Sequence, residues 1–151
     1  MSCKPSQTLA VQPDGWQVDS RVRVLVVDDE DSVRAALILL LEHHGGFRVV
    51  AEASDGVFAP ELVRALEPDL VLIDLRMPIV GGIDSLQLIR KVDPRVPVVM
   101  LSAYSDQALI SDALAAGAHA YLIKGCSAEE LFETLERAWR SEPASRTEFD
   151  V

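Results

Sequence analysis

The chain has 151 residues, 49% of them hydrophobic and 25% charged, which suits one globular domain with tails and excludes a chain that is disordered throughout. Acidic residues outnumber basic ones 24 to 14, so the net charge of −10 argues against direct binding to nucleic acid or to an anionic membrane surface. Two cysteines are too few for a disulfide framework, and without a signal-peptide pattern or a membrane-length apolar segment we expect a cytoplasmic protein.

The two ends of the chain lack the periodic apolar pattern of regular structure. Residues 1–21 include two prolines and several small polar residues, and we expect a flexible arm there. Residues 141–151 are polar and interrupted by Pro143, which is typical of a tail or of a truncated linker. The folded domain is therefore expected over residues 22–140.

Five short apolar runs alternate with longer segments of helical period inside this domain. Three of the runs are apolar throughout, which is typical of strands buried on both faces of a parallel sheet. The strands are expected at Val22–Val27, Phe47–Ala53, Leu70–Ile73, Val98–Leu101 and Ala120–Ile123.

Helices are expected after each strand. Asp31 can cap the first helix, which should end at Gly45-Gly46, and Pro60 suits the first turn of a second helix that runs to Leu66. The apolar face of the first helix is expected to consist of Val33, Leu37, Leu40 and Leu41. The later helices are expected at Asp84–Lys91, Asp106–Ala116 (with Asp106 as a cap) and Ser127–Trp139.

This alternation predicts an α/β fold, with an open, mostly parallel, five-stranded sheet and helices on both faces. Such doubly wound sheets bind ligands beyond the carboxyl ends of their strands, where the strand order reverses. Four of the predicted strands end in polar or charged groups. Asp28 and Asp29 follow the first strand, Asp74 the third, Ser102 the fourth and Lys124 the fifth.

The three carboxylates are expected to share one pocket, where their charges repel by about 1 kcal/mol or more per pair. Either raised carboxylate pKa values or a bound cation would relieve this repulsion, and hard oxygen ligands at a water-accessible edge favour Mg²⁺. One Mg²⁺ together with Lys124 balances the three negative charges. A site neutralised in this way can accept a dianionic phosphoryl group.

These motifs, taken together and in this order, resemble the receiver domain of bacterial two-component response regulators. They are VLVVDDE at residues 24–30, DLRMP at 74–78 with Gly82, Ser102-Ala103, and YLIK at 121–124. Each motif alone is weakly specific, but the set covers Val22 to Trp139 and falls at the expected strand ends. The resemblance implies a flavodoxin-like fold with strand order 2-1-3-4-5 and a phosphorelay switch rather than a turnover enzyme.

The resemblance also implies a role for each residue of the acidic cluster. Asp74 would be the phospho-acceptor, a nucleophile that takes a phosphoryl group from the histidine of a sensor kinase. Asp28 and Asp29 would position Mg²⁺ together with Asp74, and the backbone carbonyl of Arg76 would be a further ligand.

Further roles follow for the residues around the cluster. Ser102 and Lys124 would contact the phosphoryl oxygens, and Tyr121 would be an aromatic switch whose rotamer follows Ser102. Arg76 lies two residues beyond Asp74, and Tyr104 lies two residues beyond Ser102. In the family, the residues at these two positions tune the hydrolysis of the phosphoryl group. A bulky cation and a phenol there predict a long-lived phosphorylated form.

The chain departs from the common family pattern after the lysine. Gly125-Cys126 stands where many members have proline, as in the nitrate-regulator subfamily of LuxR type, so the geometry of the Lys124–Gly125 bond is open. Tyr121 also has a plain alternative role, since aromatic residues near a sheet edge usually just pack. A homodimer through the last two helices, or through the first and last, is a further expectation from the family.

Three alternative functions are weighed against the receiver. The chain can be the receiver piece of a longer DNA-binding regulator. A Mg²⁺-dependent phosphatase with an Asp nucleophile also needs an acidic cluster, but it normally has a second catalytic Asp where this chain has Arg76. An interaction module that never takes phosphate is less attractive, because the acceptor set is complete.

Overall fold

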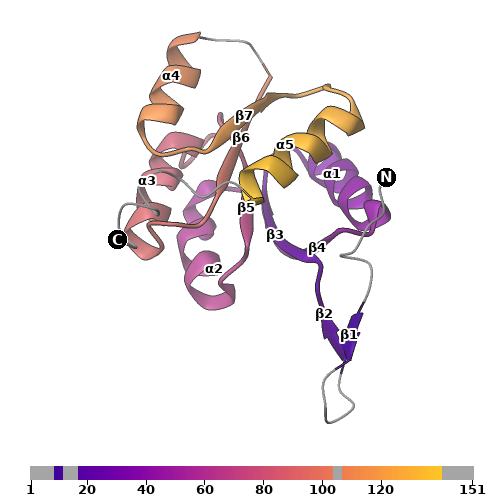
Figure 1. The fold of residues 1–151 in the computed structure, drawn as a ribbon. Coiled ribbons are helices and arrows are strands. Elements are labelled where there is room, and N and C mark those ends of the chain that lie inside the picture. Colours follow the sequence, from indigo (N-terminus) through magenta and orange to yellow (C-terminus); the bar gives the residue numbers. More distant parts are fainter. Residues whose placement is uncertain (1–8, 12–16, 104–106, 141–151) are drawn as a thin grey trace.

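The computed structural model describes residues 9–11, 17–103 and 107–140 (Figure 1). Its centre is a parallel sheet with the strand order β4-β3-β5-β6-β7. Counted along the chain within this sheet, the order is 2-1-3-4-5, which confirms the prediction. The strands are β3 (Val22–Val27), β4 (Phe47–Ala53), β5 (Leu70–Asp74), β6 (Val98–Ser102) and β7 (Ala120–Ile123).

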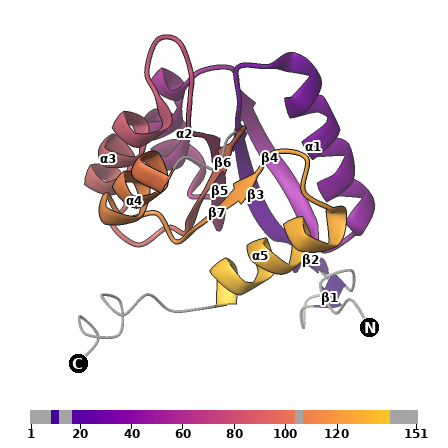
Figure 2. The ribbon, with the colours of Figure 1, turned by 90° about the horizontal axis from the view of Figure 1, so that it is seen from above.

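Within the described residues, five α-helices cover both faces of the sheet. α1 and α5 lie on one face, and α2, α3 and α4 lie on the other (Figure 2). None of the helices in the described ranges is both long and apolar enough to cross a membrane. The helices are α1 (Asp31–His44), α2 (Ala59–Leu66), α3 (Gly82–Val92), α4 (Gln107–Ala115) and α5 (Ala128–Arg140), with a short 3-10 turn η2 (Gly56–Phe58) before α2.

Alternate residues of the central strands build two separate cores. Leu25 and Val27 of β3 pack in the core formed with α2, α3 and α4, whereas Val24 and Val26 belong to the core formed with α1 and α5. All four side chains are buried, which is why these strands read as continuous apolar runs. Packing on both faces fixes the sheet, and thereby the positions of the residues at its carboxyl edge.

Two predicted details of α1 are wrong. The residue at the N-cap is Glu30, and Asp31 lies in the first turn, where its carboxylate accepts a hydrogen bond from Arg34 at 2.8 Å. Leu40 is 40% exposed, because the buried stripe is centred on Leu37 and Leu41. Ile38, on the other side of that stripe, packs against the core in place of Leu40.

The segment predicted as a flexible arm contains regular structure. β1 (Leu9–Val11) pairs antiparallel with β2 (Gln17–Asp19), which leads directly into β3. The pair projects from the amino-terminal end of the sheet (Figure 1). Each strand has only three residues, too few for a period-2 pattern to be recognised in the sequence.

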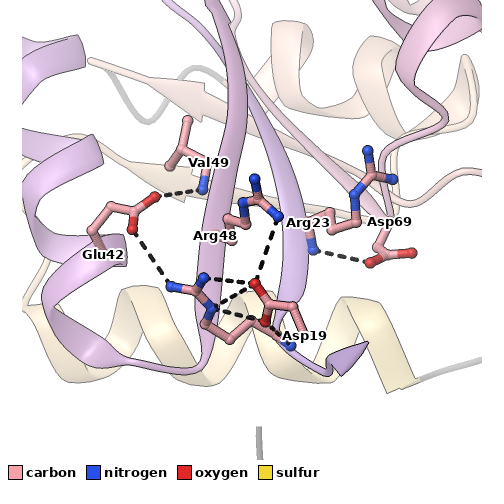
Figure 3. Close-up of polar contacts among 7 residues, drawn as sticks. Asp19, Arg23, Glu42, Arg48, Val49 and Asp69 are labelled. Carbon is pink, nitrogen blue, oxygen red and sulfur yellow. Dashed lines mark hydrogen bonds and ion pairs between the residues drawn. The ribbon is translucent and has the colours of Figure 1, made fainter. Parts of the chain in front are cut away.

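Ion pairs hold the end of β2 against the sheet. The Asp19 carboxylate accepts hydrogen bonds from Arg21 Nε at 2.9 Å and Nη2 at 2.6 Å, and it lies 3.6 Å from Arg48 Nη1 (Figure 3). Arg21 also lies 3.8 Å from Glu42 on α1. The hydrogen bonds from Arg21 lower the pKa of Asp19 to about 2, so this carboxylate stays ionised in the folded protein.

Candidate functional site

The register of the parallel strands gathers the predicted residues at one edge of the sheet. Val27 of β3 lies beside Ile73 of β5, so Asp28 and Asp74, the next residues of the two strands, are neighbours. Ser102 is the last residue of β6 and lies beside Ile123, which precedes Lys124. The backbone N–H of Lys124 donates to the carbonyl of Ser102 at 2.7 Å and fixes the lysine at this edge.

Three carboxylates come together as the sequence indicated. Asp28, Asp29 and Asp74 each offer an oxygen, and these oxygens lie within 4.8 Å of one another. Asp28 is fully buried and Asp74 is 4% exposed, whereas Asp29 lies on the rim. Asp28 Oδ1 accepts a hydrogen bond from the backbone N–H of Glu30 at 2.8 Å, and Asp74 Oδ1 accepts one from Arg76 N–H at 3.3 Å.

Lys124 places its ammonium group over this cluster. Nζ lies 3.0 Å from Asp74 Oδ2, 3.1 Å from Asp28 Oδ2 and 3.0 Å from Glu30 Oε1. Burial alone would lower the pKa of Lys124, but its contacts with the carboxylates of Glu30, Asp74 and Asp28 outweigh burial and raise the pKa. The lysine is therefore charged in the folded protein. No role was predicted for Glu30. Its position directly after Asp28 and Asp29 is the feature of the sequence that could have indicated its contact with Lys124.

The charge repulsion expected from the sequence is present. Burial raises the pKa of Asp74 to about 6, and the negative charge of Asp28 adds to the increase. The hydrogen bonds from Lys124 and from the backbone of Arg76 offset only part of it. A single lysine therefore leaves the buried carboxylates incompletely balanced.

The oxygens of the cluster fit a small divalent cation. Carboxylate oxygens are the ligands that Mg²⁺ prefers, and Asp29 on the rim leaves one side open to water. Asp28 Oδ2 is buried and accepts no hydrogen bond from the described residues, although Lys124 pairs with it electrostatically. A buried oxygen without a hydrogen bond is costly, and a cation there would recover that cost.

The residues around the cluster have contrasting exposures. Ser102 is buried at the end of β6, and Arg76 is exposed beyond β5. Tyr121 of β7 is 39% exposed, so it does not fill the core as the plain alternative supposed. Tyr104 lies outside the described residues, as does Asp106. The Lys124–Gly125 bond is trans, and Gly125 has a φ of 90°, which glycine adopts readily.

Two further residues shape the loop that follows Asp74. A Cβ on Gly82 would collide with the carbonyl oxygen of Asp74 and lie 2.8 Å from Leu75 Cα, so only glycine lets α3 begin against this strand end. The buried carboxylate of Asp55 accepts backbone hydrogen bonds from Val57, Ile79 and Val80, and it thereby ties the loop to η2. The role of Asp55 was not predicted, because two of its three partners lie 24 and 25 residues away in the sequence.

Comparison with known proteins places this geometry in a family. Residues 24–136 match the family model of the response regulator receiver domain. The transcriptional regulatory protein LnrK of Bacillus subtilis is 40% identical over 114 residues, which cover 76% of this chain and 52% of LnrK. The chemotaxis protein CheY of the same organism is 36% identical over 115 residues, which cover 76% of this chain and 95% of CheY.

A solved structure agrees with the sequence matches. The signal receiver domain of the putative response regulator NarL from Mycobacterium tuberculosis superposes with a TM-score of 0.77 at 32% identity, covering 81% of this chain and 98% of that one. The chain spans about half the length of the curated transcriptional regulators that it matches. Asp28, Asp29, Asp74 and Lys124 all fall within the matched range. The chain therefore belongs to the response regulator receiver domain family.

Proposed function

We propose that this chain is a Mg²⁺-dependent phosphorylation switch in which Asp74 accepts a phosphoryl group from the histidine of a sensor kinase. The observation that carries the proposal is the buried Asp74 carboxylate with the ammonium of Lys124 3.0 Å from its Oδ2. An oxygen of Asp74 attacks phosphorus and forms the new O–P bond. The N–P bond of the donor breaks, and its electron pair stays on the imidazole nitrogen.

Asp28, Asp29 and Asp74 would hold the Mg²⁺, with the backbone carbonyl of Arg76 as a further ligand. When bound, the ion supplies positive charge that offsets the carboxylates and stabilises the negative charge on the phosphoryl oxygens. The unsatisfied Oδ2 of Asp28 and the closeness of the three carboxylates support this assignment.

Ser102 and Lys124 would hold the phosphoryl group once it is on Asp74. Lys124 would donate to one phosphoryl oxygen, and the Ser102 hydroxyl would donate to another. Movement of Ser102 frees space beneath Tyr121, whose exposed ring turns inward. Phosphorylation would thereby shift the population between two packings of the face around β6 and β7, and an output partner or domain reads that face.

In this scheme the protein acts as a regulatory switch rather than as a turnover enzyme, because the group that accepts the phosphoryl is part of the protein. The phosphoryl group of a sensor kinase derives from ATP, so the exchange belongs in the cytoplasm. The match to about half of LnrK supports a second proposal, that this receiver is part of a longer transcriptional regulator. Pairing of two receivers through their last helices, or through the first and last, would couple the switch to such an output.

The acceptor assignment is tested with phosphoramidate, a small phosphodonor, and Mg²⁺. Intact-mass spectrometry should show one added phosphoryl group on the wild-type chain and none on Asp74→Asn. Asp84→Asn, which removes an exposed carboxylate from the first turn of α3, is the matched control and should be labelled like the wild type. Undiminished labelling of Asp74→Asn would refute the assignment, and repeated turnover of a phosphoester would favour a phosphatase.

A further inference from the structure

The ammonium group of Lys124 is shared among three carboxylates, one of which has no role in the proposed chemistry. Glu30 Oε1 and Asp74 Oδ2 both lie 3.0 Å from Nζ, and Asp28 Oδ2 lies at 3.1 Å. Nζ donates hydrogen bonds to Glu30 and Asp74, and the oxygen of Asp28 lies beside it as an ion pair, so carboxylate oxygens surround the ammonium group. A phosphoryl oxygen can therefore approach Nζ only when one of the carboxylates gives way.

Glu30 is the carboxylate that gives way at the least cost. Its side chain is 58% exposed, whereas the side chains of Asp28 and Asp74 are 0% and 6% exposed. Water can solvate a released Glu30, but a released Asp28 would keep a buried and uncompensated charge, and Asp74 is itself bonded to the phosphoryl group. The oxygens of Glu30 and Asp74 also lie the same short distance from one nitrogen, so the charge of Glu30 repels a phosphoryl group on Asp74.

We propose that Glu30 is the displaceable counter-ion of Lys124. In the resting site Glu30 neutralises the outer side of the ammonium, and a phosphoryl group that arrives on Asp74 takes its place. This inference rests on the proposed function of Asp74 and adds a residue that sets how readily the site accepts the phosphoryl group. Glu30 is a positioning residue, since it acts through Lys124 and touches no reacting atom.

The charge of Glu30 acts in opposite directions on the two ligands of the site. It adds to the negative potential that attracts a divalent cation, and it competes with a phosphoryl group for Lys124. Loss of this charge should weaken Mg²⁺ binding and strengthen phosphoryl binding. A merely structural role would weaken both, because a distorted site holds either ligand less well.

Glu30→Gln tests the proposal, because the amide keeps the size of the side chain and loses its charge. The helix should survive: Glu30 is the N-cap residue of α1, but its side chain makes no capping hydrogen bond. Mg²⁺ affinity is measured by calorimetry on the unphosphorylated protein. Beryllofluoride, a mimic of the phosphoryl group, is titrated at saturating Mg²⁺ and followed by ¹⁹F NMR. We expect Mg²⁺ to bind about two- to fivefold more weakly and beryllofluoride about two- to fivefold more tightly.

Two control variants separate the effect of the Glu30–Lys124 contact from the effect of any negative charge near the site. Asp31→Asn removes the neighbouring charge, which pairs with Arg34, and it should leave beryllofluoride binding unchanged. Glu30→Asp keeps the charge and should keep the affinity for Mg²⁺. The proposal is supported if the affinities for Mg²⁺ and for beryllofluoride shift in opposite directions in Glu30→Gln and in neither of the other two variants. Parallel weakening, unchanged affinities, or an equal effect of Asp31→Asn overturn it.

The same samples distinguish this inference from the proposed function. A wild-type chain that takes no phosphoryl group from phosphoramidate refutes the role of Asp74, whatever Glu30 does. A wild-type chain that is labelled, together with a Glu30→Gln variant whose affinities do not shift, rejects only the counter-ion.

Discussion

At the scale of single residues, we expect the buried carboxylate of Asp74 to lower the stability of the protein. An Asp with a pKa of about 6 in the folded state ionises less readily there than in the unfolded chain, where its pKa is 3.8. Well below pH 3.8 the carboxyl group is protonated in both states and costs nothing. As the pH rises from 3.8 to about 6, the unfolded chain gives up this proton before the folded protein does, so the free energy of unfolding falls and levels off above about pH 6.

Asp74→Asn should therefore stabilise the Mg²⁺-free protein. At about pH 7.5 we expect the free energy of unfolding to rise by about 1–3 kcal/mol, and the gain should shrink towards about pH 4.5. Urea denaturation in the presence of a chelator at the two pH values measures it. Asp84→Asn should change nothing at either pH. A destabilised Asp74→Asn variant would mean that its contact with Lys124 outweighs the burial of its charge.

At the scale of elements, the start of α3 depends on a glycine. Gly82 packs so closely on β5 that a methyl group would collide with the Asp74 carbonyl and approach Leu75 Cα and Met100 Cε to 2.8 Å. Two of these neighbours are backbone atoms, which cannot turn aside. The contact joins α3 to β5, the strand that ends in Asp74, so a clash there would displace the loop that follows Asp74.

Gly82→Ala should lower the free energy of unfolding by about 1–3 kcal/mol, since overpacking against a fixed backbone forces the helix away from the strand. Gly81→Ala is the matched control, because the nearest atom to its Cβ is the Leu75 carbonyl oxygen at an ordinary 3.7 Å. Urea denaturation of both variants measures the difference. Equal stability of the two would show that α3 can shift at little cost.

The sequence predicted the elements better than it predicted their side-chain partners. Continuous apolar runs such as Leu70–Ile73 are bounded by polar residues, so every strand of the main sheet was found to within one residue. Helix ends agreed to within two residues, because caps such as Gly45 mark them. The contact of Glu30 with Lys124 could not be predicted, since it depends on rotamers that only the folded sheet edge selects.

At the scale of the whole molecule, the site and the β1–β2 pair lie at opposite ends of the sheet. The pair joins the amino-terminal end of β3, and the carboxylates follow its carboxyl-terminal end. A six-residue strand separates the two ends by about 20 Å. Ion pairs of Asp19 with Arg21 and Arg48 hold the pair in place, but their side chains are partly exposed and so stabilise the fold only modestly.

A chain restricted to residues 22–140 should therefore keep the proposed phosphorylation of Asp74. Both cores and the acidic cluster fall within this range, so Mg²⁺-dependent labelling by phosphoramidate should stay within about twofold of the full chain. The free energy of unfolding should fall by no more than about 1 kcal/mol, because the ion pairs of Asp19 and Arg21 with the rest of the chain are partly exposed. Intact-mass labelling and urea denaturation of the two chains measure these quantities. A truncated chain that folds but takes no phosphoryl group would show that one of the removed ends, residues 1–21 or 141–151, acts on the site.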